Sequence, residues 1–273
     1  MRISFKTLAA SVCAAALATS AQSAELRLSH QWSTKDVRHA VAEIVADEEA
    51  AADVDLDAAR LSESAFMEAL QEQMAEDDVM VLVHGYLAGG FVGKEKCITS
   101  PEDVQGLQTR AAGKSFEQML VGAGASIASM ASSEIYSAMQ TGGLDAANTS
   151  SSSFVSYRIF EQVACYSPAS DVALWFLYQP LLMNKSTFEG LTDVQQEALL
   201  AAAAKAEAYY LEEAKEQDAA SVEVFQDAGV EIAQMTAEDF AAWQDLAQET
   251  SYKAFVDSVP DGQELLDMAL AVE

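Results

Sequence analysis

One uninterrupted helical pattern constrains the shape of this chain more than any other feature. Residues 193–228 contain neither glycine nor proline, the letters TDVQ at 192–195 form a capping box, and Gly229 follows the last helical residue. At about 1.5 Å per residue the helix would be on the order of 50 Å long, whereas a mean helix has roughly 11–12 residues. It is longer than one lobe of a 273-residue chain, so it predicts two lobes bridged by a helix.

The rest of the chain alternates between strand and helix patterns, which predicts an α/β fold. Helix starts are marked by capping boxes, SPED at 100–103 and TAED at 236–239, and helix ends by glycine or proline. The strands are expected in 25–32, 53–59, 79–87, 107–110, 144–148, 170–184 (one or two buried strands) and 230–235. The other helices are expected in 35–52, 62–77, 99–106, 114–124, 132–143 and 240–259, with a last short helix after Pro260.

The charge of the chain excludes some partners. It has 43 acidic against 15 basic residues, a formal net charge of -28. Nucleic acid is therefore not an expected partner, because phosphate binding requires clustered lysine and arginine. An anionic membrane surface is disfavoured for the same reason.

Residues 1–24 have the pattern of a secretory signal peptide. A basic start with Arg2 and Lys6 precedes an apolar run and then small residues. The alternative, a membrane anchor, fits less well, because the apolar run is short for a span. We therefore expect a periplasmic protein that is not inserted in the membrane once the signal is removed.

Two cysteines remain after residue 24, Cys97 and Cys165. An exported chain meets an oxidising compartment, so they are expected either as a disulfide or as two buried free thiols. No second cysteine or histidine stands at zinc-site spacing from either one, so no metal site is expected.

No catalytic motif emerges, and we expect neither an enzyme nor a bound cofactor. The chain lacks a Gly-x-Ser-x-Gly elbow, a phosphate loop and a dinucleotide glycine fingerprint. The serine run 150–153 has no histidine nearby and is expected to be a polar loop after a strand, with capping roles. A secreted hydrolase is the least supported function class.

Two residues, Arg110 and Asn148, remain as candidates for binding a ligand. Arg110 ends one expected strand and Asn148 ends another, and strand ends open into the ligand crevice of α/β sheets. Arginine grips a carboxylate with two parallel hydrogen bonds, and an asparagine amide can add a third. On composition alone, an ion pair between Arg110 and one of the many acidic residues is the simpler interpretation.

The segment 100–150 resembles the DctP-type solute-binding proteins of TRAP transporters. It carries the Ser-Pro-Glu-Asp lead, a strand ending in Arg110, the stretch VGAGA, the helix SEIYSAMQTG and a strand ending in Asn148. The run PLLMNKSTFEGLTDVQQEALLAAAAKAEAY is also similar to the family's approach to its long helix. The likeness extends from Glu25 to about Trp243.

The resemblance implies a function and a site. Such proteins bind a small organic acid between two α/β lobes and deliver it to membrane permease subunits of a TRAP transporter; they are not enzymes. The family's carboxylate-binding arginine falls on Arg110 and its supporting asparagine on Asn148. The turn of the GGF motif (89–91), with Phe91, is expected near the ligand. His30, Trp32 and Trp175 are candidates for the wall of the pocket, and core packing is at least as good an interpretation of the aromatic residues. The residue types of Trp32, Phe91, Trp175 and Phe176 suggest an aromatic or medium-sized apolar acid.

One departure concerns the first lobe. Between 53–61 and 62–70 the family carries several tens of further residues, on the scale of a βαβ unit. We therefore expect lobe one, 25–98 plus 179–215, to be truncated near 57–62, and lobe two, 99–178 plus 216–273, to be complete. The alternative to a working receptor is a non-binding, internally deleted relic.

Overall fold

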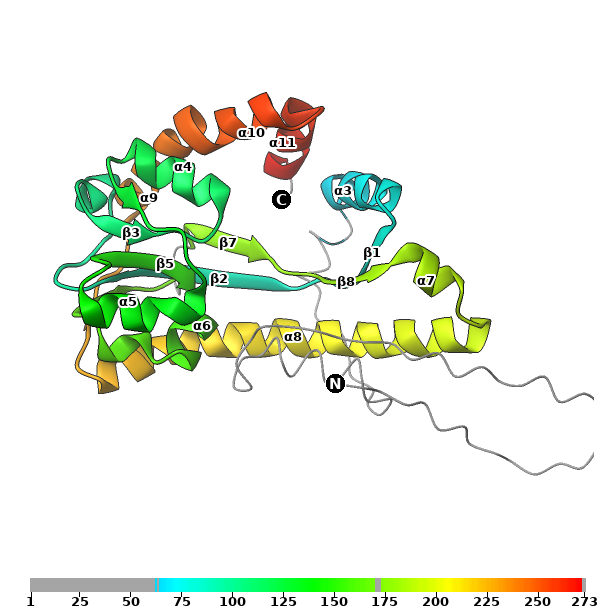
Figure 1. The fold of residues 1–273 in the computed structure, drawn as a ribbon, viewed down its shortest axis with the longest axis horizontal. Coiled ribbons are helices and arrows are strands. Elements are labelled where there is room, and N and C mark those ends of the chain that lie inside the picture. Colours follow the sequence, from blue (N-terminus) through cyan, green and yellow to red (C-terminus); the bar gives the residue numbers. More distant parts are fainter. Residues whose placement is uncertain (1–61, 63, 170–172, 272–273) are drawn as a thin grey trace, which may run out of the picture.

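The computed structural model describes residues 62, 64–169 and 173–271 (Figure 1). The elements expected in 25–59, and with them His30 and Trp32, lie outside the described residues. The described part is an α/β structure with one large and one small sheet, and the long helix α8 runs along both.

The elements follow the expected order along the chain. The strands are β1 (Val79–Val83), β2 (Tyr86–Gly93), β3 (Gln108–Arg110), β4 (Ser126–Ile127), β5 (Ala146–Ser150), β6 (Cys165–Ser167), β7 (Trp175–Tyr178), β8 (Leu181–Asn184) and β9 (Glu231–Ile232). The helices are α3 (Ala65–Glu76), η1 (Pro101–Val104), α4 (Lys114–Gly122), η2 (Ser132–Glu134), α5 (Ile135–Thr141), α6 (Ser151–Ser156), η3 (Ile159–Glu161), α7 (Lys185–Glu189), α8 (Asp193–Asp227), α9 (Ala237–Ala247), η4 (Gln248–Tyr252), α10 (Lys253–Ser258) and α11 (Gly262–Leu270).

Strand β2 connects the two sheets. The large sheet has the order β4-β3-β5-β2-β6-β9, and β7 pairs with the first half of β2. Strands β1 and β8 form the small antiparallel sheet. Because β2 follows β1 and β8 follows β7, the antiparallel ribbon of β2 and β7 leads from the large sheet to the small one (Figure 1).

Helix α8 confirms the expectation of a helix that bridges both parts. It has 35 residues, begins with the capping box of Thr192 and Gln195, and contacts β1, β2, α6 and β9. Its buried face carries mostly small side chains in its central part, which lets the helix lie close to the strands. At Gly85, between β1 and β2, an added Cβ would stand 1.9 Å from Cε1 of Tyr210, so this close approach requires glycine.

The other local signals are also confirmed. Ser100 and Asp103 form a capping box at η1, and Thr236 and Asp239 form another at α9. Helix α5 ends at Gly142, whose φ of 79° is the left-handed conformation that glycine adopts without a Cβ clash. In the serine run, Ser150 caps α6, as its Oγ accepts from the backbone N–H of Ser153, so the capping role is confirmed but most of the run is helix rather than loop.

Three local expectations are wrong. The apolar run 79–87 is broken at His84 and Gly85 into two strands instead of one. The glycines of the GGF motif lie inside β2 rather than in a turn. The strands in 170–184 are not fully buried, since Phe176 is 60% and Leu182 46% exposed. Hydrophobicity alone did not reveal these open faces, because apolar residues also occur on surfaces.

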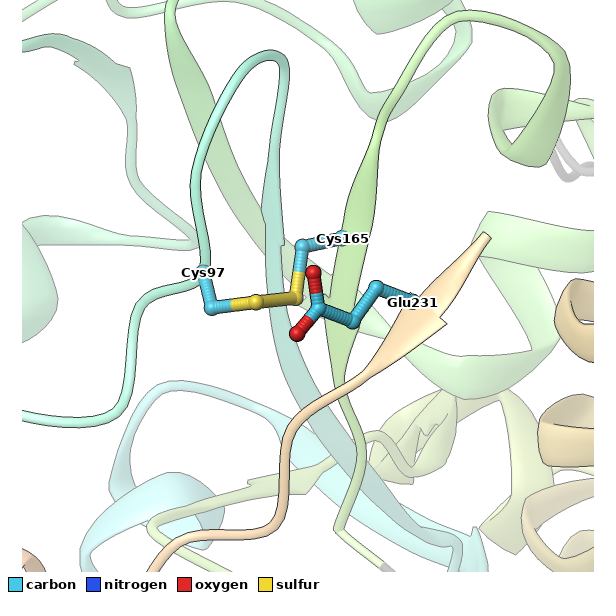
Figure 2. A group of neighbouring side chains, drawn as sticks. All are labelled: Cys97, Cys165 and Glu231. Atoms are coloured by element: carbon cyan, nitrogen blue, oxygen red, sulfur yellow. A yellow bond between two sulfur atoms is a disulfide. The ribbon is translucent and has the colours of Figure 1, made fainter. Parts of the chain in front are cut away.

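The disulfide alternative is confirmed for Cys97 and Cys165. Their Cα atoms are 5.0 Å apart, within the range of ordinary disulfides, and the bond links the segment after β2 to β6 (Figure 2). The two cysteines are 68 positions apart, and the segment between them contains both Arg110 and Asn148. The covalent link therefore encloses the elements that carry the candidate site.

Candidate ligand-binding site

Arg110 is the last residue of β3, and its side chain is held by two backbone carbonyls. Its Nε donates to the carbonyl oxygen of Met130 at 3.2 Å, and its Nη1 donates to the carbonyl oxygen of Asn148 at 2.7 Å. Met130 comes shortly after β4, and Asn148 lies in β5; these two strands flank β3 in the sheet. Arg110 is thus fixed by the neighbouring chain on both sides.

No carboxylate among the described residues neutralises Arg110. Within residues 62, 64–169 and 173–271, the ion pair with a nitrogen–oxygen distance of 4.0 Å or less joins Arg158 to Glu161. Arg110 forms no such pair with these residues. Its Nη2 has no hydrogen-bond partner among these residues either. The surface ion pair that composition suggested is therefore not formed within the described part, and N–H groups remain that suit an oxyanion.

The electrostatics of Arg110 reflect this setting. Burial lowers the pKa of the guanidinium, and the charge of Glu117 acts in the opposite direction. An arginine remains protonated in either case. A partly buried cation without a bound carboxylate gains from an anion that replaces the water it has lost.

Asn148 is fully buried, and both polar atoms of its side chain bond to backbone. Its Oδ1 accepts from the N–H of Ala112 at 3.3 Å, and its Nδ2 donates to the carbonyl oxygen of Gly90 at 3.2 Å. The residue therefore joins the loop after Arg110 to β2, while its own carbonyl holds Arg110. Its side chain supports the arginine through the backbone; the third ligand hydrogen bond expected from the sequence stays a prediction.

Of the aromatic candidates, Phe91 lies in the core and Trp175 lies at the start of a strand. Phe91 is 1% exposed, and its ring lies 5.5 Å from that of Trp243, so its surroundings are those of a core residue. Trp175 is the first residue of β7, opposite Gly89 of β2. Their roles as walls of a ligand pocket stay predictions.

A different aromatic group stands on the ribbon of β2 and β7. The ring centroid of Tyr86 lies 6.1 Å from that of Phe176 and 5.4 Å from that of Tyr178, and the Tyr178 hydroxyl is 3.0 Å from Nδ1 of His84. The sequence analysis did not single out Tyr86 or Tyr178. These two residues lie opposite each other in the antiparallel register of β2 and β7, and a single sequence does not show this register.

The described residues also form a groove, which has the wrong charge for an acid. It lies between α3, β1 and α7 and has a volume of about 640 Å³. Its lining includes Glu68, Glu72 and Glu189 with one cation, Lys185, and includes neither Arg110 nor Asn148. An anionic ligand is therefore better matched by Arg110 than by this groove.

One cluster of potential metal ligands occurs in the described part. The sulfur atoms of Cys97 and Cys165 and a carboxylate oxygen of Glu231 lie within 4.8 Å of one another (Figure 2). Because the two sulfurs are bonded to each other, neither provides the thiolate that a metal requires. In this oxidised state the cluster is a disulfide beside a carboxylate.

Two sheets joined by crossing strands, a long helix along both, and a carbonyl-held arginine at a strand end are the features expected of a two-lobed α/β solute-binding protein. The model of one family in this class, the bacterial extracellular solute-binding protein family 7 (DctP), matches residues 53–258. The chain belongs to this family.

Known relatives agree in sequence and in fold. A solute-binding protein of Albidiferax ferrireducens is 34% identical over 186 residues, 68% of this chain and 55% of that protein. A TRAP periplasmic solute-binding protein of Rhodoferax ferrireducens with bound malonate has a TM-score of 0.75 at 32% identity, covering 79% of this chain and 68% of that one. Another, from Sulfitobacter sp. NAS-14.1 with bound β-D-galacturonate, has a TM-score of 0.69 at 28% identity, covering 76% and 68%.

The chain spans about half the length of the curated relatives it matches, between 44% and 60%. None of the described helices combines the length and apolar character needed to cross a bilayer.

Proposed function

We propose that this protein is an extracytoplasmic solute receptor of a TRAP-type transporter that binds a small organic acid through its carboxylate. The observation that carries the proposal is the arginine at the end of β3. Arg110 is held by two carbonyls and has no carboxylate within 4.0 Å among the described residues. Family membership and the acids bound by similar proteins, malonate and β-D-galacturonate, support this ligand class.

In the proposed mechanism, Arg110 takes the ligand carboxylate with the N–H groups that its carbonyl partners leave available. Asn148 keeps the arginine in place, because it ties the loop after β3 to β2. The guanidinium is positioned before the ligand arrives, so less ordering entropy is lost on binding. The body of the acid then lies between the lobes, and Trp175, His30, Trp32 and Phe91 are the proposed wall residues.

The remaining parts of the proposal concern the setting. Residues 1–24 direct export to the periplasm, and the partners are the small organic acid and the permease subunits of the transporter. The two lobes comprise 25–98 with 179–215 and 99–178 with 216–273. Helix α8 and the β2–β7 ribbon connect them, and closure of the lobes around the acid converts ligand binding into a signal for the permease.

A second candidate is a non-binding relic, and one observation favours it. The described part of proposed lobe one holds the two-stranded sheet with α3, α7 and residues 193–215 of α8, whereas β2, which falls in the same range, pairs within the large sheet. This is little material for one wall of a cleft. Thermal melts with a library of acids separate the two candidates. Malonate, galacturonate, glucuronate, pyroglutamate and C4-dicarboxylates form the library, with the matching neutral amides or sugars as controls.

The receptor predicts that one acid raises the melting temperature by several degrees while its neutral analogue does not. A ligand that binds the native state alone at 100 times its Kd adds about 2.7 kcal/mol to the free energy of unfolding. If no acid shifts the melt beyond its neutral control, the relic is the better description.

A further inference from the structure

The orientation of Arg110 depends on two carbonyl groups that are not equally well fixed. The Asn148 carbonyl belongs to β5, inside the large sheet. The Met130 carbonyl belongs to residues 128–131, between β4 and η2, which are neither helix nor strand. The contact of Nε with Met130 is thus the one that needs support from elsewhere.

That support comes from the first turn of α4. The Ser129 hydroxyl donates to Oε1 of Glu117 at 2.7 Å, and this bond ties the residue next to Met130 to the helix. On the other side, the N–H of Ala131 donates to Oε2 of Glu134 at 2.8 Å. Met130 therefore lies between two residues that are each held by a carboxylate.

We propose that Glu117 is a positioning residue of the anion site: through Ser129 it fixes the Met130 carbonyl, which aligns the guanidinium of Arg110. The inference rests on the proposed carboxylate site. It adds a residue that sequence reasoning did not single out and that bonds to the support of the arginine instead of to the arginine itself.

Glu117 has two opposing effects on an acid that binds at Arg110. Its hydrogen bond to Ser129 favours binding, because it holds the arginine in one orientation. Its negative charge disfavours binding, because it opposes the ligand carboxylate in the same region. Its field does reach Arg110, since it raises the pKa of the guanidinium against the effect of burial.

Three variants separate the bond from the charge. Glu117→Gln keeps an oxygen that accepts from Ser129 and removes the charge. Glu117→Ala removes both, and Ser129→Ala removes the bond while the charge remains. Glu197→Ala, which removes an exposed glutamate from α8, is the matched control for lost charge.

The first readout needs no ligand. Proton exchange at Nε–H of Arg110 is followed by ¹⁵N NMR in the exported chain, with the signal assigned through Arg110→Lys. We expect exchange to become at least about threefold faster in Glu117→Ala and Ser129→Ala, because the lost hydrogen bond no longer holds the Met130 segment in place. Glu117→Gln and Glu197→Ala are expected to exchange as the wild type does.

Unchanged exchange in Glu117→Ala and Ser129→Ala would overturn the positioning role, whether or not an acid binds. Calorimetry with the acid found in the melts gives the second readout. The expected affinity falls about 2- to 10-fold in Glu117→Ala and Ser129→Ala and is equal or higher in Glu117→Gln. An equal loss of affinity in Glu117→Gln and Glu117→Ala would contradict the proposal that the hydrogen bond to Ser129 favours binding while the charge of Glu117 opposes it. A wild type that binds no acid would refute the proposed function and leave the exchange test of Glu117 valid.

Discussion

Replacing Asn148 by alanine tests how the site is built. The substitution leaves two backbone groups, the N–H of Ala112 and the carbonyl of Gly90, without their side-chain partner. A buried polar group that loses its hydrogen bond costs about 1–3 kcal/mol. Because the side chain is fully buried and both bonds are lost, we expect the free energy of unfolding to fall by roughly 3 kcal/mol.

Urea denaturation followed by circular dichroism measures this loss. A loss of roughly 3 kcal/mol corresponds to a melting temperature about 6–12 °C lower for a domain of this size. Asn184→Ala is the control, because this asparagine is exposed at the start of α7, and its loss is expected to cost less than about 1 kcal/mol. The variant Asn148→Ala is also expected to bind acid more weakly, since the loop after Arg110 loses its tie to β2.

One result would refute the structural role given to the Asn148 side chain. If Asn148→Ala unfolds at the same urea concentration as the wild type but binds no acid, the amide contacts the ligand directly. The backbone bonds would then contribute nothing measurable, and the reasoning given for this residue would be wrong.

Three further predictions concern charge, covalent structure and the guanidinium. Burial raises the pKa of Asp218 in α8 from 3.8 to about 6, so the contribution of this carboxyl to stability is lost as pH rises from about 4 to about 6. In pH-dependent melts, Asp218→Asn is expected to gain up to about 3 kcal/mol over the wild type at pH 7 and less at pH 4, whereas the control Glu223→Gln is expected to show no such pH-dependent gain. Replacing Cys97 and Cys165 by serine removes a link across 68 residues and lowers the unfolding free energy by about 4 kcal/mol in urea titrations. Arg110→Lys keeps the charge but loses the planar fork, so calorimetry is expected to show about tenfold weaker acid binding, equivalent to ~1.4 kcal/mol, and an undiminished affinity would contradict bidentate recognition.

Local signals in the sequence predicted the elements well. The capping box of Thr192 and Gln195 and the absence of glycine and proline up to Asp227 defined α8, because both act within a few residues of the helix. The same holds for the capping box of Ser100 and Asp103 before β3. The prediction of a long bridging helix in an α/β chain followed from these signals.

Long-range pairing was not predictable in the same way. The GGF motif lies within β2 because this strand pairs with β5, β6 and β7, and no local residue type encodes three partners. The break falls at Gly85, where an added Cβ would meet the ring of Tyr210, 125 positions further along the chain. Such contacts depend on the packed structure, so hydrophobic patterns alone merged β1 with β2.

The candidate site was predicted in part. Arg110 was predicted from its place at the end of an expected strand and from the resemblance of the surrounding segment to the family. Its two partners are backbone carbonyls, which every residue has, so no side-chain signal marks Met130 or the carbonyl of Asn148. Glu117 and Ser129 were missed for a related reason, because their role is to support one of those carbonyls.

The central claim is that this chain binds an organic acid through Arg110. Isothermal titration calorimetry of the wild type and of Arg110→Ala, with the acid that shifts the melt most, tests it directly. We predict one saturable site in the wild type and a loss of about 3–5 kcal/mol in Arg110→Ala, because a buried carboxylate is left without its cation, while circular dichroism shows an intact fold. Equal affinity in the two proteins would contradict the claim.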